Sequence, residues 1–205
     1  MTGRFIVFEG GEGCGKSTQA TRLAERLGAL LTRQPGGTDV GARIRELVLD
    51  GVAGDVTSRA EALLMAADRA QHVAEVVAPA LSAGRHVVCD RYIPSSVAYQ
   101  GHGRGLDPAE VRRISDWAVE GLRPDLILLL VVPEAVALER TGGARDRIEA
   151  AGADFHRRVD VAFRDMAVDD PEGWIVLDGT GTADEVATRV WSAVVDRLGA
   201  LEASP

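Results

Sequence analysis

The only lysine among the 205 residues of this chain is Lys16, and it lies in a glycine-rich run. The run reads Gly10-Gly11-Glu12-Gly13-Cys14-Gly15-Lys16-Ser17-Thr18 and has the spacing G-x-x-x-x-G-K-[ST]. Glycines let a loop curl until its backbone N–H groups face phosphate oxygens, and the N-terminus of a following helix adds its positive end. A lysine ammonium then reaches the β- and γ-phosphates, and the Ser17 hydroxyl can bind Mg²⁺. We therefore expect residues 10–18, the phosphate loop, to bind a nucleoside triphosphate.

The segments around the phosphate loop have the pattern that such a loop requires. Residues 4–9 read as a buried strand, and residues 17–27 as an amphipathic helix. Further strands are expected at 29–32, 86–90, 125–132 and 174–177, and helices at 39–49, 58–83, 150–167 and 182–198, with two more that begin near 107 and 133. This alternation predicts a single α/β domain over residues 1–205, with a five-stranded parallel sheet between two layers of helices.

Three helix starts carry capping signals. Ser58 and Glu61 have capping-box spacing, as do Thr182 and Glu185, while Asp107 precedes a proline at the first helical position. Gly84 is expected to end the helix that Ser58 begins.

Composition limits the class of partner. The net charge is −8, which argues against a broad basic face for duplex nucleic acid and favours a nucleotide over a polymer. We find neither a signal-peptide pattern nor an apolar run of about 20 residues, so we expect a cytoplasmic protein without membrane contact. The two cysteines are too few for a disulfide framework. Cys89 is expected in the core, and Cys14 is either a small space-filling residue or a redox-sensitive thiol.

A second phosphate site is expected where the third strand ends. Asp90 and Arg91 stand at the carboxyl end of that strand, where folds of this class bind ligands. Asp90 can hold Mg²⁺ or its water, and Arg91 can bind a phosphate with two N–H groups. A plain ion pair at the strand end is the alternative.

Two further groups of residues are ambiguous on their own. Arg69 lies one helical turn from Met65, a pairing that suits a flat ligand with one polar edge, although an arginine there is more often on a solvated face. Ser96, Tyr99 and Gln100 gain weight only because they follow Asp90 and Arg91 closely.

A glycine-rich, charged stretch at about 141–149 is expected to form a mobile flap. Arg140, Arg145 and Arg147 bracket it. Arginines that close over a triphosphate can stabilise the transition state and exclude water. An exposed basic loop without function is the alternative.

The four histidines lack the spacing of metal ligands, and we assign them no role.

Together these motifs resemble the thymidylate kinase family, whose members phosphorylate dTMP with ATP. The resemblance extends from Phe5 to about Leu198. It rests on residues 8–18, on Thr32-Arg33-Gln34-Pro35-Gly36-Gly37-Thr38, on Asp90-Arg91-Tyr92 with Ser95-Ser96-Val97-Ala98-Tyr99-Gln100-Gly101, and on Asp146-Arg147-Ile148-Glu149. It implies a P-loop nucleoside-monophosphate kinase fold, ATP with Mg²⁺ on the phosphate loop, and a homodimer.

The resemblance also implies roles for individual residues. Lys16, Asp90, Arg91 and Arg145 correspond to catalytic positions, and Ser17 and Asp90 to the metal site. Glu12 corresponds to the residue near the acceptor's sugar hydroxyl and phosphate, Arg69 to the one at the thymine edge, and Tyr99 to the one that disfavours a 2′-hydroxyl. The expected dTMP set is Glu12, Pro35, Met65, Arg69, Arg91, Ser96, Tyr99 and Gln100.

The chain departs from the family pattern in two places. Met65 stands where a phenylalanine commonly stacks on thymine, and a thioether can also pack on a ring. The flap is short and has few arginines, so the catalytic arginine is either Arg145 or Arg140, and Arg140 can instead pack on adenine. A kinase of another (deoxy)nucleoside monophosphate is therefore the first alternative. A regulatory P-loop NTPase is the second, although neither Asn-Lys-x-Asp nor a D-x-x-G after the third strand occurs.

Overall fold

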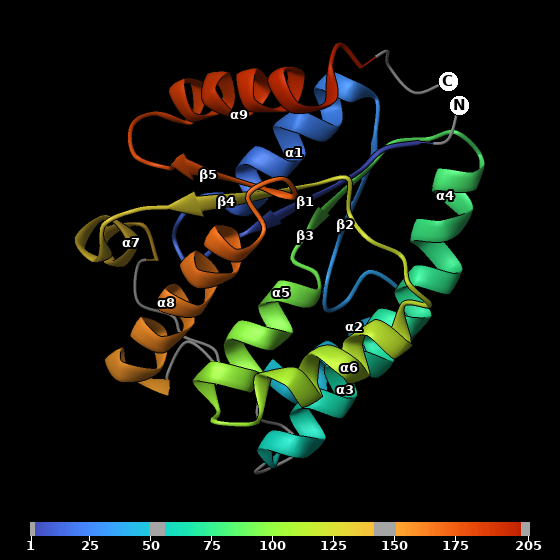
Figure 1. Cartoon of the computed structure of the whole chain (residues 1–205), viewed down its shortest axis with the longest axis vertical. Coiled ribbons are helices and arrows are strands. Elements are labelled where there is room, and N and C mark those ends of the chain that lie inside the picture. Colours follow the sequence, from blue (N-terminus) through green and yellow to red (C-terminus); the bar gives the residue numbers. More distant parts are fainter. Residues whose placement is uncertain (1–2, 50–55, 142–150, 202–205) are drawn as a thin grey trace.

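The fold is built on a sheet of five parallel strands. A computed structural model describes residues 3–49, 56–141 and 151–201 (Figure 1). The strands are β1 (Phe5–Glu9), β2 (Leu30–Arg33), β3 (Val87–Asp90), β4 (Leu126–Val131) and β5 (Trp174–Asp178), in the order β2-β3-β1-β4-β5. The five predicted strands are thereby confirmed, each to within two residues at either end.

Side chains that alternate along the strands fill two cores, one on each face of the sheet. Ile6 and Phe8 pack with helices α1 (Lys16–Leu27) and α9 (Ala183–Leu198) on one face. Phe5 and Val7 pack on the other face with α3 (Ser58–His72) and α8 (Ala153–Asp169). Figure 1 shows the three layers, with α1 and α9 above the sheet and the other large helices below it. The predicted α/β/α arrangement of layers is confirmed.

The remaining helices lie mostly on the second face. They are α2 (Asp39–Leu49), the π-helical turn η1 (Val73–Val77), α4 (Ala78–Ser82), α5 (Ile93–Ser96), the π-helical turn η2 (Val97–Gly103), α6 (Pro108–Ala118) and α7 (Glu134–Thr141). The predicted helix over 58–83 is thus one continuous run of α3, η1 and α4. Among the described residues, no helix is both long and apolar enough to cross a bilayer.

Two local expectations differ from the structure. The cap of α3 is Thr57, whose side chain accepts a hydrogen bond from the Ala60 N–H, and not Ser58. Glu61, predicted to complete a capping box, is instead buried inside the protein. We also predicted no helix for the run α5–η2, which carries Ser96, Tyr99 and Gln100. The capping box of Thr182 and Glu185 and the Asp107 cap are both present.

The strand order brings the predicted motifs to one edge of the sheet. Phe8 of β1 is in register with Asp90 of β3 on one side and with Leu128 of β4 on the other. The phosphate loop leaves β1 at its carboxyl end, and Arg91 leaves β3 at the same level, donating its N–H to the Phe8 carbonyl at 2.9 Å. Ligands bind at this edge in open parallel sheets.

Candidate active site

The phosphate loop folds tightly around the end of β1. Gly10 has a φ of 139°, and a side chain there would come within 2.4 Å of the Leu130 carbonyl oxygen. Gly15, at φ 95°, directly precedes α1, so the loop ends on a helix N-terminus. Lys16 Nζ donates to the Gly11 carbonyl at 2.7 Å and lies 3.7 Å from Cys14 Sγ. The single lysine is therefore held over the loop, where phosphate oxygens would lie.

Ser17 and Asp90 form an oxygen pair at the mouth of the loop. The Ser17 hydroxyl donates to Asp90 Oδ2 at 2.5 Å, which joins the start of α1 to the end of β3. Asp90 Oδ1 is buried, and no described residue donates a hydrogen bond to it. Hard oxygen ligands with one unsatisfied carboxylate oxygen fit Mg²⁺, which usually keeps waters and phosphate oxygens as its other ligands. The described residues contain no cluster of three or more His, Cys, Asp or Glu suited to a metal.

Arg91 is the centre of a charged group next to the loop. Its guanidinium forms a close ion pair with Glu12, donates to Tyr99 Oη at 3.2 Å and to the Gly10 carbonyl at 3.2 Å, and lies 4.9 Å from the Tyr99 ring centre. Burial raises the pKa of Glu12, but the charges of Arg91 and Lys16 outweigh it and lower that pKa to about 2. Glu12 is therefore ionised at neutral pH and orients Arg91.

A buried carboxylate holds the backbone that presents Arg91. Arg91 has a φ of 72°, a conformation that costs a non-glycine residue about 1–2 kcal/mol. Glu9 Oε1 accepts from the N–H groups of Tyr92 (2.9 Å) and Ser95 (3.2 Å), and Oε2 accepts from the Ser95 hydroxyl at 2.6 Å. Ser95 Oγ also accepts from Arg91 Nη1 at 3.1 Å. We did not predict a role for Glu9, because a glutamate that ends an apolar strand gives no distinct signal.

A polar cavity opens from this group toward α3. Its lining contains the whole set of residues that the resemblance implied for dTMP, together with Lys16, Ser17 and Asp90. We name it the polar cavity; it is lined by Glu12, Lys16, Ser17, Arg33, Gln34, Pro35, Arg45, Leu49, Met65, Asp68, Arg69, Asp90, Arg91, Tyr92, Ser95, Ser96, Tyr99 and Gln100. Residues more than sixty positions apart are thus brought into one site.

Arg69 of α3 lines the polar cavity, and it is 3% exposed. Its Nε donates to Gln34 Oε1 at 3.0 Å, Nη2 to Ser96 Oγ at 2.9 Å, and Nη1 to Ser115 Oγ at 3.2 Å. The solvated helix face that the sequence favoured is therefore wrong for Arg69. Helical periodicity could not reveal this, because α6 covers α3 from a distant part of the chain.

A chain of hydrogen bonds continues from Arg69 to His72. Since Arg69 can only donate, Gln34 presents its oxygen to Arg69 and its amino group to His72 Nδ1, at 2.7 Å. His72 then carries its proton on Nε2 and donates to Thr32 Oγ1, 2.6 Å away. Burial, with the Arg69 charge, lowers the pKa of His72 to about 4, so the imidazole is neutral. His72 therefore helps to fix Arg69, a role that the sequence does not predict.

Asp68 holds the turn that carries Pro35. Its Oδ1 accepts from the Gly36 N–H at 2.9 Å, and burial raises its pKa. Met65 is buried on the same helix and lines the polar cavity, where its thioether can pack on a planar ring.

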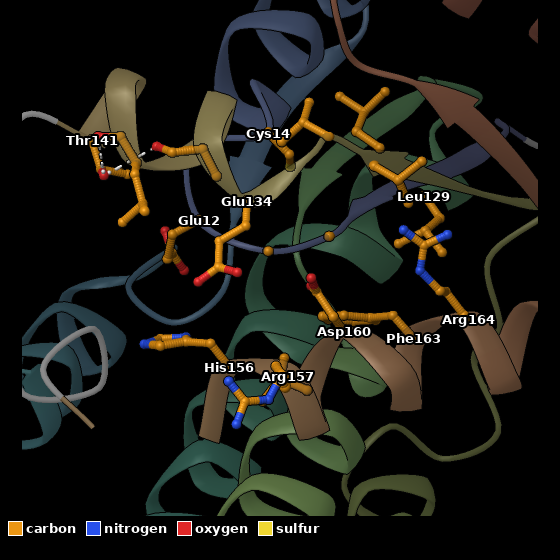
Figure 2. Close-up of a pocket in the computed structure, with 18 of the residues that line it drawn as sticks. Glu12, Cys14, Leu129, Glu134, Thr141, His156, Arg157, Asp160, Phe163 and Arg164 are labelled. Carbon is orange, nitrogen blue, oxygen red and sulfur yellow. Dashed lines mark hydrogen bonds between the residues drawn. The ribbon is translucent and has the colours of Figure 1, made fainter. Parts of the chain in front are cut away.

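A second cavity lies between the phosphate loop, α7 and α8. Figure 2 shows Glu134 and Asp160 pointing into it from opposite sides, and burial raises the pKa of Asp160. Thr141 and Gly152 are among its lining residues, and the segment 142–150 lies between them in the sequence. Arg145, Arg147 and nearly all of the predicted flap lie in that segment, outside the described residues, so their predicted roles stay predictions.

Arg140 is tied to the loop after β5. Its Nη1 donates to the Gly179 carbonyl at 3.0 Å and to the Gly13 carbonyl at 3.5 Å, and Nη2 donates to the Gly181 carbonyl at 3.2 Å. The guanidinium therefore joins α7 to the phosphate loop and to residues 179–181, beside the expected triphosphate position. Contact with adenine stays a prediction for Arg140.

Comparisons with known proteins identify the family. The sequence profile of the thymidylate kinase family matches residues 8–190. The thymidylate kinase of Cutibacterium acnes is 48% identical over 203 residues, covering 97% of this chain and 99% of that protein. That of Leifsonia xyli subsp. xyli is 52% identical over 196 residues, covering 92% of each. The crystal structure of the Ehrlichia chaffeensis thymidylate kinase superposes with a TM-score of 0.80 at 29% identity, over 95% of this chain and 99% of that one.

Proposed function

The chain belongs to the thymidylate kinase family and is an ATP-dependent kinase of dTMP, and from this premise we propose how its residues divide the reaction. The observation that carries the proposal is the polar cavity, which runs from Lys16, Ser17 and Asp90 at one end to Met65 and Arg69 at the other. We assign the phosphate loop to the donor and the polar cavity to the acceptor nucleotide.

At the donor side, backbone N–H groups of the loop and Lys16 would bind the phosphates of ATP. Ser17 and Asp90 would hold Mg²⁺, which neutralises charge on the transferred phosphoryl group when it is bound. Lys16 would balance the negative charge that builds up between donor and acceptor. Arg145 is the proposed catalytic arginine, with Arg140 as the alternative; exchanging each for lysine, and comparing the loss of kcat, separates the two.

At the acceptor side, Arg91 would bind the dTMP phosphate. Its ion pair with Glu12 keeps the guanidinium at the phosphate-loop end of the polar cavity. Glu12 and Tyr99 would lie along the sugar, since their side chains are hydrogen bonded to each other at 3.1 Å beside Arg91. Met65, Arg69, Ser96 and Gln100 would surround the base.

The decisive experiment measures ADP release with ATP and Mg²⁺ for dTMP, dUMP, UMP, dCMP and no acceptor, with Lys16→Ala as control. Strong preference for dTMP, lost in the variant, is the expected result. Preference for another monophosphate would favour the first alternative and show that Met65 changes the base selected. Equal ADP release with and without an acceptor would indicate an ATPase or a regulatory NTPase. The family match and the relatives do not favour these two activities.

We also propose a homodimer that acts in the cytoplasm. Helices α2 and α3 expose the large apolar side chains Val40, Leu47 and Leu63, and a groove between α3 and α6 includes Leu63 and Ile114. A second copy covering this face would bury these side chains. Light scattering after gel filtration tests the dimer, and Leu63→Glu is expected to yield the monomer.

A further inference from the structure

Glu61 is a buried carboxylate on α3 for which the reaction described above has no use. It is 0% exposed although it lies in the first turn of a helix whose cap does not involve it. Its Oε1 accepts from Gln100 Nε2 at 2.9 Å and from Arg104 Nε at 3.3 Å, and Oε2 pairs with Arg104 Nη2 at 3.3 Å. A carboxylate is costly to bury even when paired, so its position calls for an explanation.

The contact fixes the orientation of an amide that lines the polar cavity. An ionised carboxylate only accepts hydrogen bonds, so Gln100 must turn its amino group toward Glu61. The carbonyl oxygen Oε1 of Gln100 is then on the other side of the amide, and no described residue donates to it. Gln100, which is 2% exposed, lines the cavity beside Ser96 and Arg69.

We propose that Glu61 is a positioning residue for base selectivity, because it makes Gln100 present an acceptor, and not a donor, to the acceptor base. Thymine has a protonated N3 between two carbonyl groups, so N3–H can donate to this oxygen. Cytosine has an unprotonated N3, which would face the Gln100 oxygen as a second acceptor. An unpaired buried acceptor is penalised strongly, and such sites reject the wrong analogue.

This inference rests on the proposed function, since it requires the acceptor base to lie in the polar cavity. A positioning role for Glu61 differs from a purely structural role in one measurable respect. If Glu61 only joined α3 to η2, its loss would lower stability or slow all acceptors by the same factor. If it orients Gln100, its loss changes the ratio between acceptors.

The test compares kcat/KM for dTMP with kcat/KM for dCMP in the wild type and in Glu61→Gln. Glutamine has nearly the same shape but can donate as well as accept, so it allows the Gln100 amide to turn over. We expect the dTMP to dCMP ratio to fall about tenfold, the size of one lost hydrogen bond. An unchanged ratio in a variant that still turns over dTMP would overturn the inference and leave the proposed function standing. A wild type without preference for dTMP would overturn both.

A double-mutant cycle shows whether Glu61 acts through Gln100. Gln100→Met removes the amide, and adding Glu61→Gln to it should leave the ratio unchanged. Independent effects of the two substitutions would contradict the inference. If Glu61→Gln does not fold, the side-chain ¹⁵N signal of Gln100 in the wild type shows which way the amide is turned. The signal is assigned by its loss in Gln100→Met. Its amide protons, bonded to Glu61, should be protected from exchange with solvent before dTMP is added; protection that appears only with dTMP would mean that the amino group faces the base.

Discussion

The two ends of the active site are built in different ways. The phosphate end comes from one continuous segment, in which the backbone of residues 10–15 and the start of α1 form the binding surface. The base end comes from α3, η2 and the turn after β2, and buried side-chain hydrogen bonds hold it together. The phosphate end can lose a side chain and stay folded, whereas the base end binds its ligand with the same groups that hold the helices in place.

Lys16→Ala is expected to have the largest effect on activity and little on stability. The ammonium neutralises charge in the transition state, so kcat/KM for dTMP should fall by about 10³. Its hydrogen bond to the Gly11 carbonyl and its weak one to Cys14 Sγ contribute about 1 kcal/mol to folding. Steady-state ADP release and urea unfolding measure the two quantities. Lys16→Arg is the control for charge alone, and turnover in Lys16→Ala within tenfold of the wild type would refute the assignment.

Arg69→Met should instead impair stability and binding together. The substitution leaves Gln34, Ser96 and Ser115 without their donor inside the protein. We expect the free energy of unfolding to fall by about 3 kcal/mol, and the KM for dTMP to rise. Urea unfolding and acceptor titrations measure these changes, with the exposed Arg85→Met as the matched control. A higher KM without any loss of stability would show that the network at the base end is not structural.

Stability should fall in mild acid because of His72. The unfolded chain protonates a histidine near pH 6.5, whereas in the folded protein the pKa of His72 is about 4. The folded state therefore binds fewer protons between these pH values, so the contribution is complete above pH 6.5 and is lost as the pH falls toward 4. At pH 5 we expect a loss of about 2 kcal/mol from this group.

His72→Gln isolates this term. Glutamine can accept from Gln34 and donate to Thr32 without titrating, so the loss between pH 7 and pH 5 should shrink in urea unfolding. The lowered pKa of Glu12, about 2, acts only below pH 4.5. Burial raises the pKa of Glu9, Asp68 and Asp160, but these carboxyls are present in both proteins, so the difference between the two pH curves reports His72. The same pH dependence in the variant and the wild type would exclude His72 as the cause.

This difference in construction also explains how much could be predicted from the sequence. The phosphate loop, Asp90 and Arg91 stand at strand ends, so alternation of strands and helices places them correctly. The base end could not be derived in this way: periodicity put Arg69 on a solvated face and Glu61 in a capping box. Both are buried because α6 and η2, which lie more than thirty residues farther along the chain, pack on α3. Local pattern has no access to such contacts: helical spacing offered Arg69 only as an ambiguous candidate, and the family resemblance assigned it to the base.

The two neighbouring serines at the start of the α5–η2 run give the finest comparison of the two ends. Ser95 Oγ links Glu9 to Arg91, at the phosphate end, whereas Ser96 Oγ accepts from Arg69, at the base end. Ser95→Ala should loosen Arg91 and lower kcat/KM about fivefold, the effect of one hydrogen bond. The factor should be the same for dTMP and dCMP, because both carry the phosphate that Arg91 would bind. Ser96→Ala should lower kcat/KM by a similar factor for dTMP but by a smaller factor for dCMP. Arg69 would face only the base, and the base is the part in which the two acceptors differ. Parallel kcat/KM measurements on the two variants test this, each serving as the other's control. Equal changes in the dTMP to dCMP ratio would mean that α5 transmits both substitutions as one unit, and that the two ends are not independent.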